Sequence, residues 1–159
     1  MRIGITGHSD LSPATLALVA DALRRVLAGI RRPIIGVSCL TRGADQVFAR
    51  VVLELGGEIE VVQPAGADRE PKVGSENAAE VDDLIGKVGT VTTVRFETSD
   101  RDAYLAASDA VLTTGVDAVI AVWDGQPSVG RCGTSDVVAA ARDRGLLVAV
   151  VWPAGAARG

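Results

Sequence analysis

The chain has 159 residues, of which 48% are hydrophobic and 23% charged, a composition typical of one globular domain with a single sizeable core. Sixteen basic residues against twenty acidic ones give a formal net charge of −4, so the overall charge favours neither duplex nucleic acid nor an anionic membrane surface. The uncharged apolar runs are too short to cross a bilayer, and the first residues lack the three-part order of a secretory signal. We therefore expect a cytoplasmic protein with no duplex nucleic acid and no membrane among its partners.

The predicted elements alternate between short β-rich runs and longer segments of helical period, which is typical of a parallel sheet with helices on both faces. The first helix has the clearest start, because Ser12 is a good N-cap residue and Pro13 suits the first helical position. In chain order we expect a strand at about 2–6, a helix at 13–30, a strand at 33–38, a helix at 44–55, a strand at 58–63, a more polar helix at 75–87, a strand at 90–95, a helix at 104–112, a strand at 117–123, a helix at 135–144 and a strand at 146–152.

These elements predict one α/β domain over residues 1–152, a doubly wound Rossmann-like fold with a mainly parallel six-stranded sheet of order 4-3-2-1-5-6. The apolar runs at 117–123 and 146–152 do not alternate with polar residues, so both strands are expected to be buried on both faces, whereas the alternating run at 90–95 indicates an edge strand. The last residues, 153–159, are expected to form a flexible tail.

Several site classes are excluded by residue counts and missing motifs. The two cysteines, Cys39 and Cys132, cannot form a disulfide framework, and the single histidine, His8, leaves no cluster with zinc-ligand spacing, so we expect no metal. The GxxxxGK[ST] and GxGxxG fingerprints are absent, which argues against a P-loop NTPase and an NAD-dependent dehydrogenase. No GxSxG motif is present either. No cofactor and no catalytic residue are therefore assigned.

The candidate ligand site lies in the loops that follow the first, second and fifth strands, since ligands of doubly wound sheets bind where the strand order reverses. Glycines there let backbone approach a phosphate, and hydroxyls and N–H groups at a helix start can bind it. The expected ligand-binding residues are Gly7, His8, Ser9, Arg42, Gly43, Ala44, Asp45, Gly130, Arg131, Cys132, Gly133, Thr134 and Ser135.

Other interpretations of these residues stay open. The third loop could be a simple glycine-rich turn in which Thr134 or Ser135 caps the following helix. Asp45 could hold a ribose hydroxyl or cap its own helix. His8 could contact the ligand, act in acid/base chemistry or serve the structure alone.

Three segments carry a family resemblance: GITGHSDL at the start, SCLTRGADQVFA after the second strand and AVWDGQPSVGRCGTSDVVAAAR after the fifth. Together they resemble the SLOG superfamily, a Rossmann-like group that includes the DprA/Smf proteins, the LOG phosphoribohydrolases and the YspA/YpsA-like proteins. The turn at 42–45 is similar to the glycine-rich turn of DprA-like and YpsA-like members, and residues 130–134 are similar to the superfamily's GGT-type phosphate loop. The resemblance implies a site for a nucleotide or a nucleotide derivative.

The position of the catalytic glutamate in the LOG enzymes is occupied by Val137, so LOG-type hydrolysis is not expected. We predict a nucleotide-binding protein that senses or carries its ligand and that forms a homo-oligomer. Two alternatives remain. One is a nucleoside-phosphate or N-glycosidic hydrolase that uses Asp45, Asp124 or Asp136, and the other is a homo-oligomeric scaffold with a vestigial site.

Overall fold

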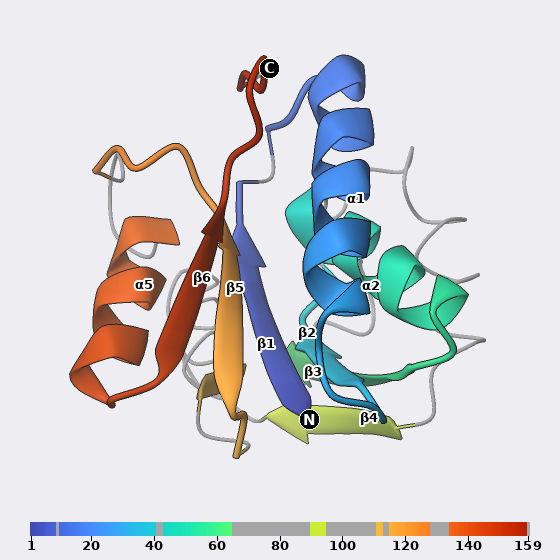
Figure 1. Ribbon diagram of the computed structural model, residues 1–159. Helices are drawn as coiled ribbons and strands as arrows, with labels where there is room; N and C mark the ends of the chain where they lie inside the picture. Colours follow the sequence, from blue (N-terminus) through green and yellow to red (C-terminus); the bar gives the residue numbers. More distant parts are fainter. Residues whose placement is uncertain are drawn as a thin grey trace.

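The computed structural model describes residues 1–8, 10–40, 43–64, 90–94, 111–112, 115–127 and 134–158. Its elements are shown in Figure 1. In chain order they are β1 (Arg2–Gly7), α1 (Pro13–Ala28), β2 (Ile35–Ser38), α2 (Ala44–Glu54), β3 (Glu58–Pro64), β4 (Thr90–Val94), β5 (Ala118–Val122), α5 (Thr134–Asp143) and β6 (Leu147–Val151). The helices expected at 75–87 and 104–112 lie outside the described residues, apart from 111–112, which are helical.

The six strands form one sheet in the order β4-β3-β2-β1-β5-β6, and every pairing is parallel. This is the predicted α/β fold, and the strand order coincides with the expected one. The order reverses at β1, which pairs with β2 on one side and with β5 on the other. Helices α1 and α2 cover one face of the sheet and α5 covers the other (Figure 1).

Helix α1 begins as its sequence predicts. The Ser12 side chain accepts a hydrogen bond from Thr15 N at 3.2 Å, with Pro13 at the first helical position. Val19, Leu23 and Leu27 then recur at helical spacing and are completely buried. This buried stripe fixes which side of α1 faces the sheet.

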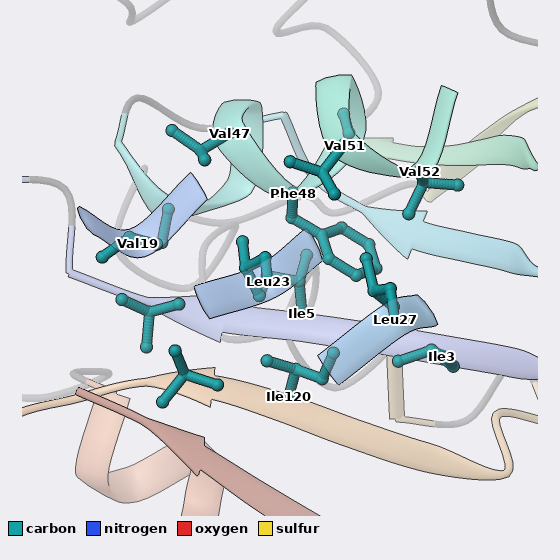
Figure 2. Close-up of a cluster of buried hydrophobic side chains, with 14 of the residues drawn as sticks. Ile3, Ile5, Val19, Leu23, Leu27, Val47, Phe48, Val51, Val52 and Ile120 are labelled. Carbon is teal, nitrogen blue, oxygen red and sulfur yellow. The ribbon is translucent and has the colours of Figure 1, made fainter. Parts of the chain in front are cut away.

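The larger of two apolar clusters lies between the sheet and the pair α1 and α2. Figure 2 shows its Phe48 ring pointing toward Leu23 and Leu27. The ring needs Gly36 beneath it, because a Cβ at that position would lie 2.8 Å from the ring edge. The smaller cluster lies on the other face and includes Val137 of α5. The two clusters are the two cores expected of a sheet with helices on both faces.

The expectation that both apolar strands are buried is correct for β5 and wrong for β6. Strand β6 lies at the edge of the sheet, where Leu147 is 72% exposed and Val150 is 46% exposed. A run without polar residues shows only that neither face is polar, and it does not distinguish a central strand from an edge strand. At the opposite edge lies β4, as its alternating sequence predicts.

Residues 153–158 were expected to belong to a flexible tail, yet they contact the start of α1. Thr15 Oγ1 lies 2.8 Å from both Ala157 O, to which it donates, and Ala157 N, from which it accepts. Leu11 and Arg158 form an isolated antiparallel β-bridge. A segment rich in Pro, Ala and Gly carries no sequence signal for such anchoring, because backbone groups make most of the contacts.

Candidate functional site

The carboxyl end of β1 meets both β5 and the first turn of α2. His8 N donates to Val122 O at 3.1 Å, and Ala44 N donates to His8 O at 3.2 Å. Gly7 permits this approach, since a Cβ at Gly7 would lie 2.5 Å from Ala44 Cβ and 2.9 Å from Val122 Cβ. The structure thus brings together Gly7, His8 and Ala44, which the sequence placed in one site.

His8 is held from two sides and is only 9% exposed. Its ring meets Trp152 edge to face, with centroids 5.7 Å apart and planes at 84°. Its Nε2 accepts a hydrogen bond from Asp124 N at 3.2 Å and lies 3.2 Å from Asp124 Oδ1. Nε2 therefore lies within hydrogen-bond distance of both the backbone and the carboxylate of Asp124. Together, Asp124 and Trp152 hold the orientation of the His8 ring.

Asp124 is held by the turn that follows β5. Its Oδ1 accepts a hydrogen bond from Gln126 N at 3.0 Å, and Trp123 Nε1 donates to Gln126 O at 2.8 Å. The pKa of Asp124 is lowered, first by the hydrogen bond from Gln126 and then by His8 and the charge of Arg158, although desolvation acts in the opposite direction. The carboxylate is therefore ionised at neutral pH.

The connection between β2 and α2 is shaped by unusual backbone angles and a buried polar cluster. Gly43 adopts φ 89° and ψ −124°, a glycine conformation, and Leu40 has a positive φ of 55°. Ser38 Oγ accepts from Leu40 N at 3.0 Å, and Gln46 Nε2 donates to Leu40 O at 3.4 Å. Both backbone polar groups of the strained residue are thus satisfied. Sequence reasoning did not single out Ser38 or Gln46, because ordinary polar residues give no signal of burial.

Asp45 belongs to the same cluster and is 6% exposed. Its Oδ2 accepts a hydrogen bond from Ser38 Oγ at 3.4 Å. The N-cap of α2 is Gly43, without a side-chain capping bond, and Asp45 lies in the first turn, so the interpretation of Asp45 as the cap is wrong. Burial and the Asp45 carboxylate together raise the pKa of the Cys39 thiol, which keeps that thiol protonated and unreactive at neutral pH.

Thr134 is the first residue of α5 and is buried. Val137 packs in the smaller apolar cluster with Val37 and Val119. The position that corresponds to the LOG glutamate therefore faces the core. Six predicted site residues lie outside the described residues: Ser9, Arg42, Gly130, Arg131, Cys132 and Gly133. In the ranges that are described, no three His, Cys, Asp or Glu side chains gather in a way that could hold a metal ion, and no helix is long and apolar enough to cross a membrane.

Arg158 is a further residue of the site that sequence reasoning missed. Its Nε donates to both carboxylate oxygens of Asp10 at 3.2 Å, and its NH1 lies 3.9 Å from Asp124 Oδ2. Arg158 comes from a segment without helical or strand periodicity. Only the folded backbone brings it to the carboxyl ends of β1 and β5.

No protein-family model matches the sequence, and no curated protein matches it significantly. Solved structures do match. The DNA processing protein A (DprA) of Streptococcus pneumoniae has a TM-score of 0.69 at 18% identity over 97% of this chain and 51% of its own. TM1055, a structural genomics target, has a TM-score of 0.58 at 16% identity over 92% of this chain and 71% of its own. The molybdenum cofactor carrier protein of Chlamydomonas reinhardtii has a TM-score of 0.54 at 16% identity over 94% of this chain and 74% of its own.

The likeness to these structures is one of fold. It shows the Rossmann-like α/β fold that the sequence predicts. The chain spans about half the length of DprA. Since one fold hosts many functions, any activity has to be argued from the site itself.

Proposed function

We propose that this protein binds a nucleotide or a nucleotide derivative at the carboxyl ends of β1, β2 and β5 and acts as a carrier or sensor of that ligand. The supporting observation is the close approach of Gly7 to Ala44, which puts the first turn of α2 at the point where the strand order reverses. A helix N-terminus there offers N–H groups and the positive end of its dipole to a phosphate. The carrier protein among the structural neighbours gives one precedent for such a role on this fold.

The burial of Asp45 and the lowered pKa of Asp124 favour ligand binding without catalysis over hydrolysis. Asp45 is buried and bonded to Ser38. Asp124 is more exposed, but its lowered pKa makes it a poor proton donor near neutral pH and a weak base. A hydrolase needs one carboxyl group with a pKa tuned toward neutrality, and the lowered pKa of Asp124 does not meet that need.

The test is calorimetric titration of the full chain with AMP, ADP, ADP-ribose and a cyclic dinucleotide, with product analysis of each mixture. Two variants make a matched pair. Asp124→Asn removes a carboxylate at the carboxyl end of β5, and Asp117→Asn removes one just before the amino end, where Asp117 Oδ2 accepts from Arg2 N at 2.8 Å. We expect a nucleotide to bind without being converted to a product. Asp124→Asn should weaken that binding, and Asp117→Asn should not change the affinity. Equal effects of the two variants, or no binding to the wild type at millimolar nucleotide, would refute the proposal.

The lack of a duplex nucleic-acid partner and the cytoplasmic location remain predictions from the charge balance and the short apolar runs. Duplex DNA belongs in the same titration panel, because salt-dependent binding at micromolar concentrations would contradict the first of them.

We also propose that β6 pairs with β6 of a second copy. From residue 145 to residue 157 the chain carries no charged side chain, so nothing along this edge repels an identical strand, whereas exposed edge strands usually carry charges that prevent pairing. An antiparallel twofold pairing centred on Ala149 would set Leu147 opposite Val151 of the other copy and would cover the exposed Val150.

A further inference from the structure

We propose that Arg158 is a positioning residue of the candidate site: it holds one oxygen of Asp124, and Asp124 in turn fixes the ring of His8. The effect on ligand affinity rests on the proposed function. The geometric part, from Arg158 to His8, does not depend on it.

The backbone around Arg158 is placed by contacts with the start of α1. Arg158 forms the β-bridge with Leu11, which is buried in the larger apolar cluster. One residue earlier, Ala157 contacts Thr15 Oγ1 through both its N and its O at 2.8 Å. Thr15 is itself fixed by Ser12, whose hydroxyl donates to Thr15 Oγ1 at 2.9 Å. The Arg158 side chain therefore leaves an anchored backbone.

The guanidinium lies between two carboxylates. It binds Asp10 through Nε and NH2 at 3.2 Å, and its NH1 extends to 3.9 Å from Asp124 Oδ2. A planar guanidinium presents several N–H donors in fixed directions and can serve two carboxylates at once, which a lysine ammonium does less well. The pair with Asp10 is exposed, so by itself it adds little stability. Its consequence is the orientation of the guanidinium toward Asp124.

The two oxygens of Asp124 are divided between different partners. Oδ1 lies 3.2 Å from His8 Nε2 and accepts from Gln126 N at 3.0 Å, whereas Oδ2 faces Arg158. A carboxylate held on one oxygen only can turn about its last side-chain bond. Arg158 opposes that rotation from the other oxygen. Its removal is therefore expected to change the surroundings of the His8 ring without touching the ring directly.

Because the chain has a single histidine, the effect of Arg158 on the His8 ring can be measured without overlap from other histidines. We would record the ring nitrogen signals of His8 by NMR on the ¹⁵N-labelled full chain at about pH 9, well above the ordinary histidine pKa of about 6.5. Arg158→Ala should shift both ring nitrogen signals, and Arg158→Lys should shift them less.

Arg24→Ala is the matched control, because Arg24 also binds two carboxylates, those of Asp21 and Glu54, on an exposed surface of α1 and α2. It removes the same charge and should leave the His8 signals in place. Ring signals that stay at their wild-type positions in Arg158→Ala would overturn the proposal, as would equal shifts in Arg24→Ala.

Calorimetry with AMP as the probe tests the link to binding. Arg158→Ala should weaken AMP binding by about tenfold, the loss expected when one hydrogen bond to the ligand is lost, and Arg158→Lys should recover part of it. If the His8 signals move but the wild type binds none of the nucleotides, the proposed function fails and the positioning role stands. If AMP binds and the signals do not move, the positioning role fails and the proposed function stands.

Discussion

Replacing Gly7 by Ala tests whether the meeting of β1, β5 and α2 depends on the missing side chain. The added Cβ would lie 2.5 Å from Ala44 Cβ, 2.9 Å from Val122 Cβ and 3.0 Å from Val122 O. Two of these atoms are Cβ atoms, whose positions are fixed by the backbone, and the third is a backbone oxygen. None of them can move aside without a shift of the backbone. Overpacking of this kind costs roughly 1–3 kcal/mol, and the upper end applies here because the helix start or β5 has to shift. Urea unfolding at constant m-value measures the loss.

The companion variant Ala44→Gly removes the nearest of these atoms. If the contact at 2.5 Å is the main cost, Gly7→Ala should destabilise the Ala44→Gly background less than the wild type, with a coupling energy of about 1 kcal/mol or more. Gly29→Ala is the control, since its Cβ would meet only Val26 O at 3.7 Å and the backbone φ there is −85°. That change should be neutral or slightly stabilising. A Gly7→Ala protein as stable as the wild type, or additive losses in the double variant, would refute the reasoning.

Three further outcomes are expected. Phe48→Ala should cost about 3–5 kcal/mol in urea unfolding, because the ring is completely buried. The lowered pKa of Asp124 means that its carboxylate stabilises the fold above the ordinary aspartate pKa of about 3.9, so the stability difference between wild type and Asp124→Asn should be constant near neutral pH and shrink as the pH falls through the folded-state pKa. Val150→Lys should reduce the sedimentation coefficient to that of a folded monomer, with native circular dichroism as the check of folding, and an unchanged coefficient would argue against pairing through β6.

The strand order agrees with the one expected for a doubly wound sheet, which alternation and handedness make one of a few parallel orders. Short β-rich runs separated by amphipathic segments leave few parallel topologies once crossovers are right-handed. The position of β1 at the reversal then follows, and with it the meeting of Gly7 and Ala44. Boundaries with clear chemistry were also predictable, as at Ser12 and Pro13, since a hydroxyl cap and a fixed φ act locally.

Features that depend on contacts distant in sequence were not predictable. Ser38 accepts from the N–H of the strained Leu40 and donates to the buried Asp45, and neither Ser38 nor Asp45 differs in type from an exposed residue. Leu147 is apolar yet exposed. Its exposure was not predictable, because the hydrophobicity of a residue does not tell whether its strand has a neighbour on both sides. Arg158 reaches Asp10 across 148 positions of the chain, and periodicity has no bearing on such a pair.

The packing of α5 bears on the choice between binding and hydrolysis. Val137 contributes to the smaller apolar cluster, so a glutamate at that position would carry its charge into the core, at a cost that a lone carboxylate avoids only by becoming protonated. Asp136 lies one residue earlier, about 100° around the helix, and is exposed. The face of α5 that packs on the sheet is thus closed to a carboxylate, and the acidic residue beside it points elsewhere. Helix α5 can offer its N-terminal residues to a ligand, but its first turn does not supply a LOG-type catalytic carboxylate from position 137.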